Sequence, residues 1–71
     1  MLELRLRSGE IVNFDGRILE VFASSGGVER LHIAHGEAIR AALARLQFAR
    51  HEAPARARLL AAIEQAQRAD G

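Results

Sequence analysis

The chain of 71 residues contains no cysteine, tryptophan, tyrosine or lysine, and it has only one proline. Because cysteine is absent, neither a disulfide bridge nor a thiolate-bound metal can hold the fold together. Because lysine is absent, arginine supplies all ten basic side chains, and nine acidic residues leave a formal net charge of +1. This near balance is unlike the dense basic surface of nucleic-acid-binding domains, and it disfavours a role at anionic lipid surfaces.

Long apolar runs are also absent. The first ten residues, MLELRLRSGE, include two acids, so the sequence predicts no signal peptide, no membrane span and a cytoplasmic location. Hydrophobic residues make up 49% of the chain, but fourteen of them are alanines, which bury little area each. Residues 1–71 are therefore expected to form a single small domain with a limited core, for which oligomerisation is a common remedy.

The first half of the chain has the pattern of short strands joined by turns. Residues 2–7, LELRLR, alternate strictly between leucine and charged side chains, as in a half-buried strand. Turn signals follow at Ser8-Gly9-Glu10, Asp15-Gly16 and Ser24-Ser25-Gly26-Gly27. We therefore predict an antiparallel meander of three to four strands over about residues 2–34.

The lengths of these turns predict which residues face each other. A three-residue loop Ser8-Gly9-Glu10 pairs Leu6 with Val12, and a two-residue loop Asp15-Gly16 pairs Val12 with Leu19. A three-residue loop Ser24-Ser25-Gly26 pairs Leu19 with Leu31 and Glu20 with Arg30. All three turns then agree on one inner face, made of Leu2, Leu4, Leu6, Val12, Phe14, Leu19, Val21, Leu31 and Ile33.

From Gly36 onward the apolar residues follow a helical period. Ile39, Leu43 and Leu46 share one side of a helix expected over about residues 37–50. Pro54 suits the first turn of a second helix, expected over about residues 54–69, in which Leu59 and Ile63 share a face. The predicted fold class is α+β, with the meander followed by a helical hairpin that covers its inner face.

The same register leaves large apolar residues on the outer face of the sheet, namely Ile11, Ile18, Phe22 and Val28. One interpretation is that the helices fold over this face, or that isolated surface apolar residues need no partner. The other is a contact between subunits or with another protein, which an apolar patch on a small domain often marks.

Phe48 is a further large apolar residue that is expected outside the core. In a helix over residues 37–50 it lies opposite the apolar stripe, on a face exposed to solvent. The alternative is that the helix ends earlier and Phe48 turns inward. If the outer-face residues and Phe48 both mark contacts, the interface residues are Ile11, Ile18, Phe22, Val28 and Phe48, and a homodimer or higher oligomer is expected.

Residues with catalytic or ligand-binding chemistry do not form a recognisable motif. His32 and His35 lie three apart, so on a strand they point to opposite faces, and they converge on a metal only if the strand ends at Ile33. The SSGG stretch precedes a strand and no lysine follows it, which differs from a phosphate-binding loop. We therefore predict no metal, no cofactor and no enzymatic activity.

The arginines of the second half support an alternative function. Arg40, Arg45, Arg56 and Arg58 could contact phosphates of a nucleic acid. They are interleaved with acidic residues, and the sheet lacks an aromatic platform for stacking bases. Nucleic-acid binding through the helical hairpin therefore stays the alternative to protein binding.

The stretch IVNFDGRILEVFASSGGVERLHIA, residues 11–34, resembles hairpins of bacterial PH-like domains, where an FDG turn leads into a strand, a glycine turn and an R-L-x-I return strand. The complete barrel of that family has more strands than this chain supplies. The resemblance therefore implies a trimmed relative, or a half that completes itself by pairing with a second chain. It also implies protein contact more than catalysis, and it carries over no site residue.

Overall fold

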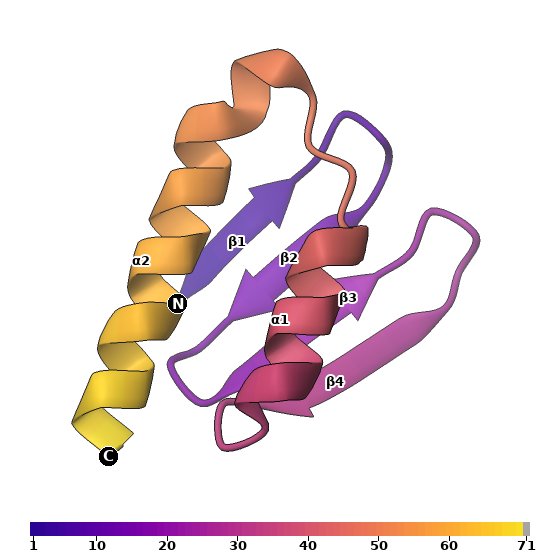
Figure 1. Cartoon of the computed structure of the whole chain (residues 1–71). Coiled ribbons are helices and arrows are strands. Elements are labelled where there is room, and N and C mark those ends of the chain that lie inside the picture. Colours follow the sequence, from indigo (N-terminus) through magenta and orange to yellow (C-terminus); the bar gives the residue numbers. More distant parts are fainter. Residues whose placement is uncertain (71) are drawn as a thin grey trace.

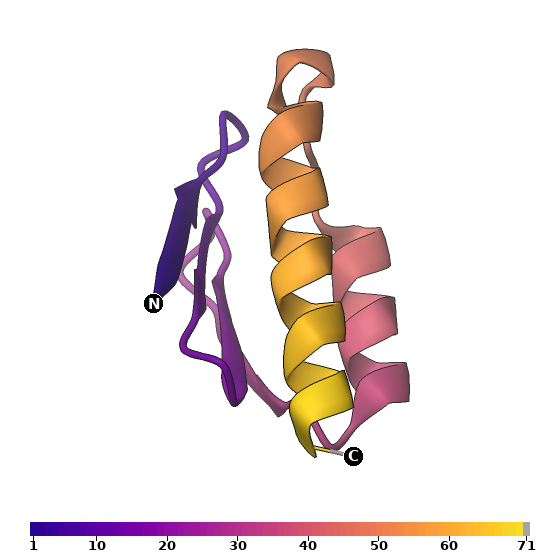
Figure 2. The same ribbon diagram turned by 90° about the vertical axis from the view of Figure 1, so that its left-hand side faces the viewer.

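A computed structural model describes residues 1–70 as a four-stranded antiparallel sheet with two α-helices on one of its faces (Figures 1 and 2). The strands are β1 (Leu2–Arg5), β2 (Ile11–Phe14), β3 (Ile18–Phe22) and β4 (Val28–His32). The helices are α1 (Gly36–Arg45), the short 3₁₀ helix η1 (Arg50–Glu52) and α2 (Ala53–Asp70). The strand order β1-β2-β3-β4 is that of a meander, so the predicted α+β class and topology are confirmed.

The hairpin of β3 and β4 has the predicted register. Leu19 lies opposite Leu31, and Glu20 lies opposite Arg30. Gly26 ends the three-residue loop with a φ of 103°, a left-handed conformation that glycine adopts without steric cost.

The registers of the two earlier hairpins were predicted wrongly, each by two residues. Leu4, instead of Leu6, lies opposite Val12, because the first loop comprises Arg7, Ser8 and Gly9 and is closed by Leu6 and Glu10. Gly9 takes a φ of 100°, and this left-handed residue is the last of a three-residue hairpin loop.

The turn between β2 and β3 is likewise displaced by one residue. Gly16 and Arg17 occupy its centre, and Gly16 has a φ of 99°. The Asp15 carboxylate fixes this turn, because its Oδ1 accepts hydrogen bonds of 2.8 Å from the backbone N–H groups of Arg17 and Ile18. Val12 therefore lies opposite Val21 and not opposite Leu19.

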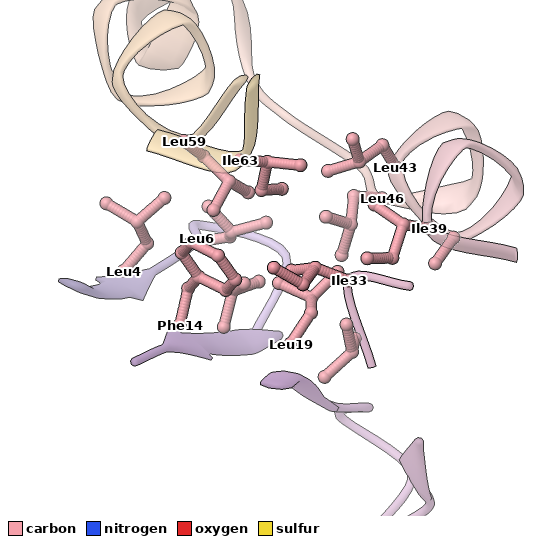
Figure 3. Packing of buried hydrophobic residues seen from close by; sticks show 13 residues of the cluster. Leu4, Leu6, Phe14, Leu19, Ile33, Ile39, Leu43, Leu46, Leu59 and Ile63 are labelled. Atoms are coloured by element: carbon pink, nitrogen blue, oxygen red, sulfur yellow. The ribbon is translucent and has the colours of Figure 1, made fainter. Parts of the chain in front are cut away.

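The inner face is nevertheless the predicted one, because a slip of two residues preserves the side to which each side chain points. The buried core comprises Leu4, Leu6, Val12, Phe14, Leu19, Val21, Ile33, Ile39, Ala42, Leu43, Leu46, Leu59 and Ile63. Leu2 and Leu31, also predicted to face inward, are partly buried against this core. Figure 3 shows Leu59 and Ile63 of α2 above Leu4 and Leu6, and Ile39 and Leu43 of α1 beside them.

Helix α1 ends at Arg45, five residues before the predicted boundary. The chain then runs without helical structure through residues 46–49, and Leu46 packs into the core. Two carboxylates accept hydrogen bonds from this linker: Glu10 Oε1 from Gln47 N–H at 3.0 Å, and Glu52 Oε1 from Ala49 N–H at 2.8 Å. These bonds occupy backbone donors that a continuing helix would direct to its own carbonyl groups.

Candidate interaction surface

Three of the predicted interface residues form a continuous row across the outer face of the sheet. Ile11 lies opposite Phe22, and Phe22 lies opposite Val28, so the row crosses β2, β3 and β4. Val28 is 52% exposed, and Ile11 and Phe22 are half-buried. We call these three residues the apolar row. Its continuity follows from the register, because directly opposed side chains on one face lie in contact distance.

Ile18 lies on the same face but is separated from the apolar row. Its opposite residue is His32, and Glu20 stands between Ile18 and Phe22 along β3. Glu20 forms an ion pair of 2.6 Å with Arg30 Nε across the strands. Among its polar residues the outer face therefore carries an apolar row and a separate isoleucine, with the Glu20–Arg30 pair between them.

Neither helix covers the outer face. Figure 2 shows α1 and α2 in one layer on the opposite side of the sheet. Their apolar residues belong to the core that lies on the inner face. Within residues 1–70 the interpretation that the helices fold over Ile11, Phe22 and Val28 is therefore wrong, and these side chains meet solvent or a partner.

Phe48 does not lie on an exposed helix face. Because α1 ends at Arg45, Phe48 falls in the linker, where it is partly buried and packs against the core. The alternative considered for this residue, that the helix ends early and the ring turns inward, matches this arrangement. The structure thus separates Phe48 from the four outer-face residues and gives it a packing role within the subunit.

The four arginines of the nucleic-acid alternative do not form one surface. Arg45 Nη2 donates to both carboxylate oxygens of Glu29, at 2.6 and 2.8 Å, and so ties the end of α1 to the edge strand β4. Arg56 and Arg58 are two residues apart on α2, which places them on different flanks of the helix. Arg40 is exposed in the middle of α1.

The histidines do not converge on a common ligand. His32 Nδ1 accepts a hydrogen bond of 3.1 Å from Ala34 N–H, which fixes the ring at the end of β4. In the part of the chain that the structure describes, no three histidine, aspartate or glutamate residues lie close enough together to hold a metal ion.

Two carboxyl groups have lowered pKa values, and both accept backbone hydrogen bonds that hold turns of the fold. The backbone N–H groups of Ile18 and Arg17 lower the pKa of Asp15 below its usual value. The N–H of Ala49, with that of Arg7, lowers the pKa of Glu52. Glu52 Oε2 accepts the Arg7 N–H at 3.0 Å, so one carboxylate joins the first turn of the sheet to the start of α2. The sequence analysis missed this role, although the acid lies just before a helix, where such caps occur.

A groove of about 560 Å³ lies between the sheet and the C-terminal half of α2. Its lining includes Leu2 and Phe14 from the sheet, and Ala62, Ala66 and Ala69 from the helix. The residue pattern did not predict this groove, because a groove depends on how α2 is placed against the sheet.

No family model, no curated protein and no solved structure matches this chain. The resemblance of residues 11–34 to PH-like hairpins therefore stays a prediction. None of the helices described in residues 1–70 is long and apolar enough to cross a membrane.

Proposed function

We propose that this protein is a small, non-enzymatic interaction module that self-associates through the outer face of its sheet, in the cytoplasm. The observation that supports the proposal is the apolar row of Ile11, Phe22 and Val28, which both helices leave uncovered. Contiguous apolar surface of this kind is typical of protein contacts, and aromatic residues are enriched at their centres.

The occupant that we propose for this face is a second copy of the chain. A net charge of +1 gives two copies little mutual repulsion. Phe22 lies in the middle of the apolar row, so two such rows related by a two-fold axis would bring their aromatic rings together. The neighbouring Glu20–Arg30 pair carries both signs of charge, and it could exchange partners with its symmetry mate.

The test is the variant Phe22→Asp, followed by light scattering behind a sizing column at several loading concentrations. The chain lacks tryptophan and tyrosine, so its elution is followed by refractive index. We expect a lower mass than the wild type at equal loading, because a charge in the middle of a buried apolar contact is strongly unfavourable. Circular dichroism should still show the folded chain, since Phe22 lies outside the core.

Phe48→Asp is the matched control. It introduces the same charge at an equally large aromatic residue, but Phe48 packs against the core of its own subunit. We expect it to lower the melting temperature, whereas Phe22→Asp lowers the mass. If Phe22→Asp leaves both the mass and the melting temperature unchanged, the apolar row is not a subunit contact.

A further inference from the structure

The two edges of the sheet differ in their capacity to accept another strand. β1 and β4 each have a neighbour on one side only. An unpaired edge presents a row of backbone donors and acceptors, and charged residues on an edge often serve to prevent pairing with another chain. The charges on β1 and β4 can be compared directly. The registers show which residues of each edge strand direct their backbone N–H and C=O groups away from the sheet.

The free backbone groups of β1 belong to Glu3 and Arg5. Leu6 N–H donates to Glu10 O at 2.8 Å, so these two residues form a hydrogen-bonded pair. Such pairs alternate along an antiparallel ladder, which makes Leu4 and Val12 the next one. The N–H and C=O groups of Glu3 and Arg5 therefore point away from β2.

The stretch of β1 with free backbone groups ends before Arg7. Arg7 N–H is already occupied, because it donates to Glu52 Oε2 at 3.0 Å. Among residues 1–70, no hydrogen bond from outside the sheet ladder reaches the backbone of Glu3 or Arg5.

The sequence of β1 is complementary to itself in one antiparallel register. With Leu4 opposite Leu4 of a second copy, Glu3 faces Arg5 of that copy, and Arg5 faces its Glu3. Both of these are hydrogen-bonded positions, so four backbone hydrogen bonds and two opposite-charge pairs form around one two-fold axis. The neighbouring register, shifted by two residues, places Glu3 opposite Glu3, and the shift in the other direction places Arg5 opposite Arg5.

The edge strand β4 has no comparable register. Glu29 and Leu31 pair with β3 through their backbone hydrogen bonds. The backbone groups that point away from the sheet therefore belong to Val28, Arg30 and His32. Pairing two copies of β4 around Arg30 sets two arginines opposite each other, and pairing around Glu29 opposes two glutamates. Pairing around Leu31 sets Arg30 opposite His32, which supplies no opposite-charge pair. β4 therefore carries charges that disfavour self-pairing, whereas those of β1 favour it.

Helix α2 lies on the β1 side of the helix layer (Figure 1). Three of the four α2 residues that line the groove are alanines, Ala62, Ala66 and Ala69, and the fourth is Gln65. We call this part of α2 the alanine flank. Helices pack at about 8–10 Å when short side chains face each other. A second copy joined at β1 would thus place its α2 beside this alanine flank. The leucines of both β1 strands would share one inner face.

We propose that a second copy of this chain pairs antiparallel with β1 around Leu4, which joins two sheets into one of eight strands. This contact is separate from the outer-face contact and goes beyond it. With both contacts the assembly exceeds a dimer, and with either one alone it is a dimer.

The test uses the Phe22→Asp chain, in which the outer-face contact is removed and the edge acts alone. We add either Arg5→Glu or Glu3→Arg and measure the mass by light scattering. The parent should have a mass near twice 7.8 kDa. Each added change should weaken the dimer at least about tenfold, because two attractive cross-strand pairs become repulsive.

An equimolar mixture of the two charge variants is the decisive sample. One chain then carries two arginines on β1 and the other two glutamates, so both cross-strand pairs become attractive again, and a dimer should re-form. Arg40→Glu makes the same charge change at an exposed residue of α1 and should leave the parent dimer intact.

Two results would overturn the edge contact. The first is a mixture no heavier than its separate components while both variants remain folded by circular dichroism. The second is a Phe22→Asp parent that is a monomer at every loading. The latter result would leave the outer-face contact standing if the wild type still associates, so the two proposals fail separately.

Discussion

The two faces of β3 carry similar apolar residues, but one face is buried and the other is exposed. Leu19 and Val21 point inward and are 0% and 9% exposed. Ile18 and Phe22 point outward, and Ile18 is 38% exposed. Hydrophobicity alone therefore does not define the core of this domain. The core lies on the inner face because α1 and α2 cover that face, and the apolar residues on the other face remain available for a partner.

The largest effect that separates the two faces should come from Leu19→Ala. Leu19 is fully buried, so its truncation leaves a cavity and should lower the free energy of unfolding by about 2–5 kcal/mol. Ile18→Ala on the outer face should cost less than half as much in a dilute sample. Urea unfolding followed by circular dichroism measures both, and equal losses would contradict the assignment of the faces.

A smaller effect on stability is expected from substitutions in the turns that join the strands. Gly9 and Gly26 both have φ values near +100°, so alanine at either position should cost about 1–2 kcal/mol of stability. A Cβ at Gly9 would also lie 3.0 Å from the Cβ of Ser24, whereas a Cβ at Gly26 meets open space. Gly9→Ala should therefore lower the melting temperature more than Gly26→Ala, and the reverse order would contradict the close approach of the two turns.

The smallest effect concerns acid stability on the helix side of the sheet. Backbone hydrogen bonds lower the pKa of Glu52, so its charged form stabilises the folded state above the usual value of 4.5. This contribution is lost as the pH falls through the lowered pKa. Glu52→Gln should therefore flatten the dependence of stability on pH in that acidic range. Glu64→Gln removes one negative charge from an exposed residue of α2 and is the control for the change in net charge.

The sequence predicted the face to which each strand residue points better than it predicted which residues lie opposite each other. Alternation in LELRLR and the positions of the glycine turns are local signals, and they gave the correct inner face. The exact pairing depends on which loop residue takes the left-handed conformation. Gly9 ends its loop and does not stand in its middle, and this one-residue displacement of the loop moved the register by two.

The end of α1 could not be predicted from local sequence. Residues 46–49 contain neither glycine nor proline, and Leu46 continues the apolar stripe of Ile39 and Leu43. The helix ends because Glu10, thirty-seven residues away, accepts the Gln47 N–H, and because Leu46 enters the core. The prediction of Phe48 as an interface residue depends on the longer helix. That of Phe22 depends on strand alternation, and the structure places Phe22 in β3 opposite Val28, on the outer face.

The meander has a consequence for the order in which the chain folds. Every strand pairs with its neighbour in sequence, so each hairpin closes only a short loop and should form early. The attachment of α2 near β1, by contrast, joins residues as far apart as Arg7 and Glu52. We expect this docking to come last, because its loop-closure entropy is the largest. Until α2 docks, Leu4 and Leu6 lack their cover, so the late intermediate would be the species most prone to aggregation.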